Sequence, residues 1–303
     1  MLQFGIDLGG TKTEIIVLND KGDELLRERA PTPSTSYPAI VDTICSLVEQ
    51  ARDRFSQPYT LGIGIPGALS YQTGLVKNAN TVCLIGNDLK GDIERRLNHP
   101  IVIANDADCL ALSEATDGAG AGYPTVFAVI IGTGCGGGWV VNGQLISGPN
   151  AIAGEWGHNP LPWRDDGDSE AECYCGQKGC LETLLSGTGF RRQALVETGI
   201  DRTSVEWNRL YEAGDPVAIR VFERYHSRIA RALASVINLM DPHAIVLGGG
   251  ASNMTSIYQN VPALLPQWVF SDTVETPLLR SVHGDSSGVR GAAWLGSQQA
   301  SKQ

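Results

Sequence analysis

Apolar positions recur along this chain with two different spacings, which separate the expected strands from the expected helices. Short apolar runs that end in glycine, proline or asparagine predict strands, whereas apolar residues three and four positions apart predict helices. The predicted strands are residues 4–8, 14–18, 24–27, 61–65, 101–104, 125–131, 139–141 and 244–247. The predicted helices are residues 40–55, 88–97, 107–115, 215–240 and 288–295. The alternation of strands and helices predicts an α/β fold.

One part of this pattern occurs twice. A strand, a turn rich in glycine and threonine, and a second strand fill residues 4–18 and again residues 126–141. Internal repetition indicates duplicated structure, so we expect two similar α/β halves that face each other across a central cleft.

The glycine-rich segment 117–122 marks the boundary between these halves. We therefore expect a smaller N-terminal domain at residues 1–117, completed by a C-terminal helix at 288–303. The larger domain is expected at residues 118–287, and it contains a cysteine-bearing loop at 158–180.

Composition narrows the range of partners. The chain has 303 residues, of which 42% are hydrophobic, and a net charge of −10. The hydrophobic fraction allows a core in each half, and the acidic balance argues against a nucleic-acid partner. The N-terminus lacks the basic and apolar stretches of a secretory signal, and glycines interrupt the uncharged segment 123–154. We therefore expect a cytoplasmic protein without a membrane span.

The two glycine-containing turns are candidate phosphate sites. Glycine lets backbone N–H groups approach an anion closely, and a neighbouring threonine adds a hydroxyl donor. The first turn holds Gly9, Gly10 and Thr11, and the second runs from Gly132 to Gly138. Asp7 precedes the first turn and is a candidate ligand of the Mg²⁺ that accompanies ATP. Two ordinary hairpins are the alternative interpretation.

A third glycine segment, 248–250, follows the buried strand 244–247 and offers a flat surface for the nucleotide base. A simple strand-to-helix turn is the alternative. The second turn also fits the spacing G-x-G-x-x-G at 132–137, but a strand follows it where a dinucleotide site needs a helix.

Asp106 stands where strand 101–104 gives way to helix 107–115, at the expected mouth of the cleft. A carboxylate there can accept the proton of an attacking hydroxyl group. The alternative is that Asp106 only caps the helix that begins at Ala107. Glu155 and His158 are three positions apart, so in one helical turn both would face the same way.

Three of the seven cysteines lie together, whereas the other four are scattered. An uneven set of this kind in a reducing compartment indicates thiols or metal ligands instead of disulfides. Cys173, Cys175 and Cys180 supply three zinc ligands, and His158 is the candidate for the fourth because it lies nearby in the chain. Four protein ligands predict a structural zinc site, and three free thiols are the alternative.

Six motifs, taken in order, resemble the motif series of the ROK family of sugar kinases, and the resemblance runs from residue 4 to about residue 295. The motifs are Asp7–Lys12, Gly64–Gly67, Asn105–Ala107, Gly132–Gly136, Gly154–His158 and Cys173–Glu182. Within the family, the segments Val76–Asn80 and Gly154–Trp163 are similar to bacterial fructokinases of the manno(fructo)kinase type.

The resemblance implies an actin-like, ribonuclease-H-like fold of duplicated α/β domains. It also implies transfer of the γ-phosphoryl group of ATP to the 6-hydroxyl group of D-fructose, with mannose as a second substrate, and a homodimer. Asp106 would be the general base. The implied sugar contacts are Gly67, Asn80, Asn105, Asp106, Glu155, His158 and Glu182. Together with the turns above, the expected ATP contacts are Gly5, Asp7, Gly9, Gly10, Thr11, Lys12, Gly132, Thr133, Gly134, Gly136, Gly137, Gly249 and Gly250.

Two other functions stay open. A kinase of N-acetyl-D-glucosamine or glucose in the same family would carry the same motifs. A non-catalytic protein that binds or senses sugar is the alternative from another class. The acidic charge argues against a DNA-binding version, and the presence of Asp106 and of the Gly132 turn argues against an inactive one.

Overall fold

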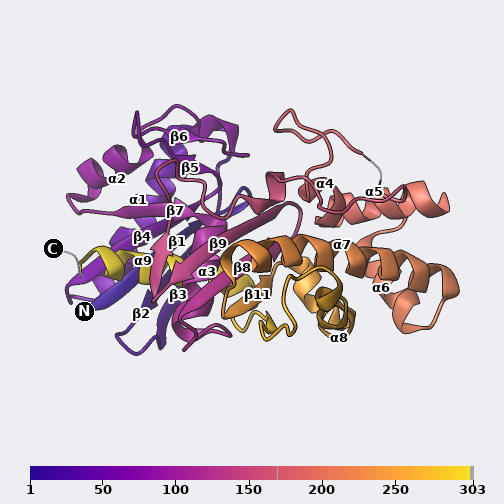
Figure 1. Cartoon of the computed structure of the whole chain (residues 1–303). Helices are drawn as coiled ribbons and strands as arrows, with labels where there is room; N and C mark the ends of the chain where they lie inside the picture. Colours follow the sequence, from indigo (N-terminus) through magenta and orange to yellow (C-terminus); the bar gives the residue numbers. More distant parts are fainter. Residues whose placement is uncertain (169, 301–303) are drawn as a thin grey trace. The chain divides into compact units, whose positions relative to one another are not determined.

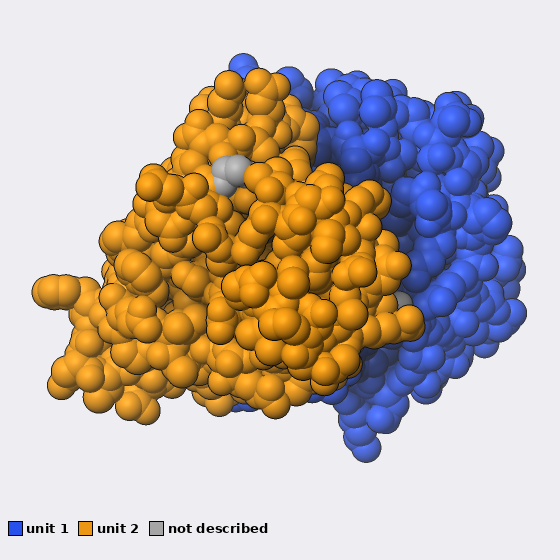
Figure 2. All heavy atoms as spheres, turned by 90° about the vertical axis from the view of Figure 1, so that its right-hand side faces the viewer, with its two compact units in different colours: residues 1–122, 138–153, 282–303 blue, residues 123–137, 154–281 orange. Residues whose placement is uncertain are grey.

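The computed structural model describes residues 1–168 and 170–300 (Figure 1). The chain groups into two compact units, which Figure 2 colours separately. The first unit contains residues 1–122, 138–153 and 282–303, and the second contains residues 123–137 and 154–281. The last part of the expected C-terminal helix, residues 301–303, lies outside the described residues.

The grouping differs from the division expected from the sequence at residue 117. Residues 138–153 were expected in the second domain, but they group with the first unit. The physical reason is close packing, because Gly138 lies against the helix of residues 106–117, where an added Cβ would be 2.8 Å from the Ala111 side chain. The expected division into domains that fold as separate units stays a prediction.

The first sheet has five strands in the order β3-β2-β1-β4-β7. The strands are β1 (Leu2–Leu8), β2 (Lys12–Leu18), β3 (Glu24–Pro31), β4 (Tyr59–Ile65) and β7 (Val102–Asn105). β1, β2 and β3 form an antiparallel meander, and β1, β4 and β7 run parallel.

The second sheet repeats this order as β10-β9-β8-β11-β12. Its strands are β8 (Thr125–Ile131), β9 (Cys135–Val141), β10 (Gln144–Ile146), β11 (Ala244–Gly248) and β12 (Leu278–Arg280). β9 and β10 are antiparallel, whereas β8, β11 and β12 run parallel. When the strands of each sheet are numbered in chain order, both sheets have the spatial order third, second, first, fourth, fifth. This shared order confirms the duplicated α/β fold.

Helices cover both faces of the first sheet. α1 (Tyr37–Arg54) and α2 (Leu89–Leu97) share one apolar core cluster with β1, β2 and β4. α3 (Asp106–Asp117) and α9 (Ser287–Ala300) pack with each other, and α9 also packs on β1 and β4. Gly5 and Gly62 allow this approach, because a Cβ at either position would collide with the α9 backbone.

The helices of the second unit were only partly predicted. The long helix α7 (Pro216–Met240) is confirmed, and it buries most of its length. α4 (Glu182–Leu185), α5 (Gly187–Thr198), α6 (Ser204–Glu212) and α8 (Thr255–Leu264) were missed. Of these helices, α6 buries only Trp207, and α8 contains Pro262, which is unusual inside a helix.

Short elements connect these parts. They are the strands β5 (Ala68–Leu69) and β6 (Val76–Lys77) and the 3₁₀ turns at Val82–Leu84, Trp156–His158, Gly250–Asn253, Leu265–Gln267 and Gly284–Ser286. Among the described residues, no helix combines the length and the apolar character that crossing a membrane requires.

Candidate functional site

The first glycine turn joins β1 to β2 in the first unit. The Gly9 N–H donates to the Lys12 carbonyl over 2.9 Å, and Thr32 Oγ1 donates to the Gly9 carbonyl over 2.8 Å. An added Cβ at Gly10 would meet only Thr81 Oγ1 within 4 Å, so a ligand can approach this backbone. Lys12 begins β2, and its Nζ lies 3.8 Å from the buried Glu14 carboxylate. The fold thus gives the first turn the accessible backbone expected of a phosphate site.

Asp7 lies near the end of β1 and shares an acidic environment with Asp106. Burial, together with the charges of Asp106 and Glu14 and against the opposing effect of Lys12, raises the pKa of Asp7 to about 6. Carboxylates that repel each other in this way are stabilised by a cation. The donor set therefore fits the expected Mg²⁺.

Asp106 is the first residue of α3, and its side chain is exposed. Asn105 is the N-cap, and its Oδ1 accepts the Ala107 N–H over 2.8 Å. Asp106 Oδ1 accepts from the same N–H over 2.8 Å. The carboxylate of Asp106 therefore supports the helix start, and its exposure leaves it accessible to a substrate, while its role as general base stays a prediction.

Asn105 organises the neighbouring loop. Its Nδ2 donates to the Gly67 carbonyl over 3.1 Å, so both ends of its amide are used within the protein. Gly67 has a φ of 87°, and a Cβ there would collide with the backbone of Lys77 and Ala79. These contacts bring Gly67, Asn105 and Asp106 together with the segment that precedes the exposed Asn80. The sugar contacts expected in the first unit therefore gather in one place.

The second glycine turn borders a cavity of about 390 Å³ within the second unit. Gly132, Thr133 and Gly250, three of the expected ATP contacts, line this cavity. An added Cβ at Gly250 would meet no atom within 4 Å, whereas Gly249 has a φ of 76° and packs against Ile131. The other lining residues are Ile131, Gly187, Thr188, Phe190, Ser204, Tyr225, Ala251 and Met254. Half of them belong to α5 and α6, which the sequence did not predict: Gly187, Thr188, Phe190 and Ser204.

Three expected ATP contacts, Gly5, Gly136 and Gly137, lie inside strands. The turn is shorter than predicted, because β9 begins at Cys135 and Gly136 and Gly137 already lie in this strand. A Cβ at Gly137 would press on the Phe127 ring of the neighbouring strand. Gly5 faces α9, as described above. Gly5 and Gly137 are therefore packing glycines, and Gly136 uses its carbonyl to accept from Trp156 Nε1 over 2.8 Å.

Glu182 connects the second turn to the cysteine loop. Its Oε2 accepts the Cys135 N–H over 3.0 Å, and an added Cβ at Gly134 would lie 2.9 Å from the same oxygen. Because Cys180 lies two positions before Glu182, this contact fixes one end of the cysteine loop against the turn. Glu155 is exposed and precedes the 3₁₀ turn that carries His158.

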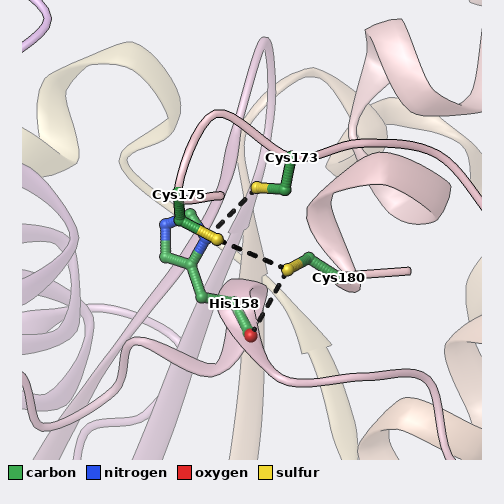
Figure 3. Close-up of side chains that lie close together, drawn as sticks. All are labelled: His158, Cys173, Cys175 and Cys180. Carbon is green, nitrogen blue, oxygen red and sulfur yellow. Dashed lines mark hydrogen bonds between the residues drawn. The ribbon is translucent and has the colours of Figure 1, made fainter. Parts of the chain in front are cut away.

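The four predicted metal ligands converge (Figure 3). His158 Nδ1, Cys173 Sγ, Cys175 Sγ and Cys180 Sγ all lie within 4.8 Å of one another. Cys175 Sγ is 3.7 Å from Cys180 Sγ, and Cys173 Sγ is 3.5 Å from His158 Nδ1. A tetrahedral zinc ion, with bonds of about 2.3 Å to sulfur and about 2.0 Å to nitrogen, separates its ligands by about 3.8 and 3.5 Å. The donor set therefore fits zinc.

Tyr174, between two of these cysteines, was not predicted to have a role. Its hydroxyl lies 3.0 Å from His158 Nε2, whereas Cys173 Sγ lies near the other ring nitrogen, Nδ1. Sequence spacing offered no signal for this contact, because it depends on how the loop folds back over His158.

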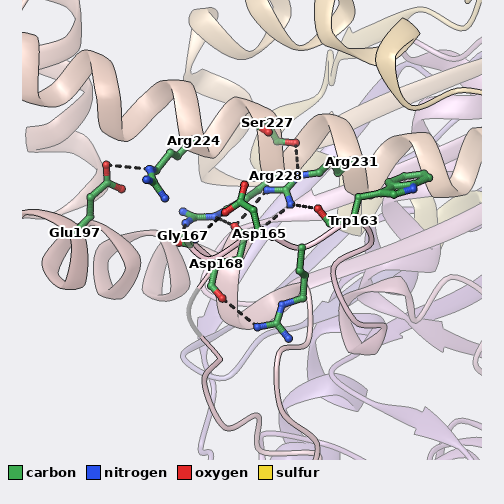
Figure 4. A network of polar contacts seen from close by, with 10 residues as sticks. Trp163, Asp165, Gly167, Asp168, Glu197, Arg224, Ser227, Arg228 and Arg231 are labelled. Atoms are coloured by element: carbon green, nitrogen blue, oxygen red, sulfur yellow. Dashed lines mark hydrogen bonds and ion pairs between the residues drawn. The ribbon is translucent and has the colours of Figure 1, made fainter.

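Buried ion pairs hold the base of the same loop (Figure 4). Arg228 Nε and Arg231 Nη1 of α7 lie 2.8 and 2.7 Å from the two carboxylate oxygens of Asp168. Burial alone would raise the pKa of Asp168, but the hydrogen bonds from Arg231 and Arg228 outweigh it and hold this pKa at about 2. Arg231 also donates to the Trp163 carbonyl. Sequence spacing did not indicate this network, because Asp168 is 60 and 63 positions from its arginine partners.

Comparisons with known proteins agree over nearly the whole chain. The family model described as the ROK family matches residues 3–299. An N-acetyl-D-glucosamine kinase from Vibrio parahaemolyticus is 37% identical over 299 residues, which cover 97% of this chain and 99% of that protein.

Two solved structures show the same architecture. A ROK hexokinase from Thermus thermophilus is 29% identical with a TM-score of 0.89, and the match covers 100% of both chains. A ROK family glucokinase from Streptomyces griseus, solved with glucose and AMPPNP, is 28% identical with a TM-score of 0.78, and the match covers 98% of this chain and 100% of that chain. These likenesses confirm the expected actin-like fold.

Proposed function

The chain belongs to the ROK family and is an ATP-dependent sugar kinase, and from this premise we propose that it phosphorylates the 6-hydroxyl group of a hexose. N-acetyl-D-glucosamine is the first candidate sugar. The observation that carries this choice is the 37% identity to an N-acetyl-D-glucosamine kinase across 97% of the chain. The expected fructokinase type thus gives way to the alternative within the same family.

D-fructose is the second candidate. The segments Val76–Asn80 and Gly154–Trp163 support it, because they are similar to bacterial fructokinases. A pocket distinguishes related sugars by only a few contacts, each worth about 1–3 kcal/mol, so identity over the whole chain does not fix the preferred sugar.

In the proposed mechanism, Asp106 is the general base. Its carboxylate accepts the proton of the 6-hydroxyl group while the oxygen bonds to the γ-phosphorus and the bond to the β-phosphate oxygen breaks. Asn105 and Gly67 fix the loop beside Asp106. Glu155, His158 and Glu182 are the proposed sugar contacts of the second unit, and each can accept or donate a hydrogen bond to a hydroxyl group.

The nucleotide is proposed to occupy the cavity beside Gly132 and Gly250. The backbone of this turn and of the Gly9–Thr11 turn would donate to the phosphates. Asp7 would hold the Mg²⁺, and this ion would neutralise charge on the transferred phosphoryl group. The homodimer stays part of the proposal.

Zinc is the proposed metal of the cysteine loop. His158, Cys173, Cys175 and Cys180 would hold it, and four protein ligands leave no position for chemistry. Its role would be structural, because the loop joins His158 to Glu182 and both are proposed sugar contacts.

The test is a panel of sugars assayed for ADP release with ATP and Mg²⁺: N-acetyl-D-glucosamine, D-glucose, D-mannose and D-fructose. We expect the highest kcat/KM for N-acetyl-D-glucosamine. A highest value for D-fructose would select the second candidate, and no turnover with any sugar would contradict the kinase function.

A further inference from the structure

Tyr174 contacts His158 at Nε2, the ring nitrogen that is not next to Cys173 Sγ. The distance from the Tyr174 hydroxyl to Nε2 is 3.0 Å. The two rings meet edge to face, with centroids 5.2 Å apart and planes at 87°. The tyrosine is thus placed on the imidazole by both its ring and its hydroxyl group.

The contact uses the one hydrogen-bonding position that Nε2 offers. An imidazole nitrogen either carries one hydrogen or presents one lone pair, and both lie in the plane of the ring. The other nitrogen, Nδ1, is 3.5 Å from Cys173 Sγ and belongs to the metal ligand set. A sugar hydroxyl that uses His158 therefore has to use Nε2, where the Tyr174 hydroxyl already lies.

The Tyr174 hydroxyl contacts one of the side chains that are proposed to bind the sugar, His158. His158, Glu155 and Glu182 are the complete set of expected sugar contacts in this unit.

The Tyr174 side chain can also move away from His158. The residue is 80% exposed, so its ring can turn into solvent without opening the core. Its neighbours in the chain, Cys173 and Cys175, stay fixed in the ligand set.

We propose that the Tyr174 hydroxyl is a built-in competitor for the sugar position on His158, so that each sugar molecule must displace it in order to bind. Tyr174 is then a positioning residue that lowers sugar affinity. The inference rests on the proposed sugar role of His158, but it holds for whichever hexose the enzyme prefers.

The test compares the wild-type protein with Tyr174→Phe, which keeps the ring and removes the hydroxyl. One intramolecular hydrogen bond corresponds to about a two- to tenfold change in an equilibrium constant. We expect the sugar dissociation constant, measured by calorimetry, and the KM for the sugar to fall by that factor, with kcat little changed. Tyr123→Phe is the matched control, and we expect no change in either quantity.

The other outcomes are distinct. An unchanged or weaker sugar affinity in Tyr174→Phe would overturn the competition. A loss of bound zinc in this variant would assign Tyr174 a structural role in the metal site and overturn it as well. If the wild-type protein binds no hexose, the proposed function fails and this inference fails with it, whereas sugar binding without the predicted gain refutes only the inference.

Discussion

At the scale of single residues, Asp106 has two tasks at one carboxylate. It accepts the Ala107 N–H at the start of α3, and its side chain is exposed. A helix N-terminus also favours negative charge at this position. The same local position thus serves stability and the proposed chemistry.

Asp106→Asn separates these tasks. The amide oxygen can still accept the Ala107 N–H, but it cannot take a proton from the sugar. We expect kcat/KM to fall by about 10²- to 10⁴-fold, with little change in melting temperature. Steady-state assays and thermal unfolding measure the two effects, with the exposed Asp53→Asn as control. Retention of wild-type turnover by Asp106→Asn would contradict the assignment of the base.

At the scale of elements, the cysteine loop depends on two supports. The proposed zinc joins His158 to the three cysteines, and the Asp168 network ties the segment before them to α7. The two supports use different residues of the loop, so each can be removed separately.

Removal of zinc is expected to impair sugar binding more than ATP binding. The ligands hold His158 and lie next to Glu182, whereas the cavity beside Gly250 contains none of them. We expect a strong chelator to release about one zinc per chain, as measured by atomic spectroscopy, and to raise the KM for the sugar. Added zinc should restore it. If the purified protein holds no zinc and binds sugar normally, the proposed metal site is refuted.

Asp168→Asn is expected to destabilise the protein by about 3–5 kcal/mol, because it leaves Arg228 and Arg231 buried without their carboxylate. The effect depends on pH. A carboxyl whose folded pKa is about 2, below the unfolded value, stabilises the fold above about pH 4 and loses this contribution as the pH falls toward 2. Denaturant unfolding between pH 2 and 7 should therefore show the variant and wild type converging at low pH. The exposed neighbour Asp166→Asn should show no such convergence.

At the scale of the whole molecule, the first unit is assembled from three separate stretches of chain. Glu114 of α3 connects two of them, because its carboxylate accepts the N–H groups of Ala119, Val282 and His283 and the hydroxyl group of Ser287. Asp117 adds a hydrogen bond from His283 at 2.9 Å. These contacts anchor the chain where it returns from the second unit to begin α9.

The His283 contact makes this anchor sensitive to pH. The hydrogen bond with Asp117 raises the pKa of His283 above 6.5, against the effect of burial. A group with a raised folded pKa stabilises the fold fully below its unfolded value and loses this contribution as the pH rises through the folded value. His283→Gln should therefore cost more stability at pH 6 than at pH 9, as measured by denaturant unfolding. An equal cost at both values would contradict the charged contact.

Local sequence determined much of this protein. The apolar periods predicted most strands and the helices α1, α2, α3, α7 and α9, because each of these elements has a strong amphipathic or buried pattern. The duplicated hairpins predicted two similar α/β halves. The convergence of the proposed metal ligands was also predictable, since three of the four lie within eight positions of one another.

Only the tertiary structure decided the rest. It separated the packing glycines Gly5 and Gly137 from the open Gly10 and Gly250, which have the same side chain and differ only in what lies opposite them. It also assembled the cavity from residues between Ile131 and Met254. It brought Asp168 into contact with the arginines of α7, and Tyr174 into contact with His158. Periodicity records which face of a segment is buried, but the partner on that face is set by packing between distant segments, and local sequence carries no record of it.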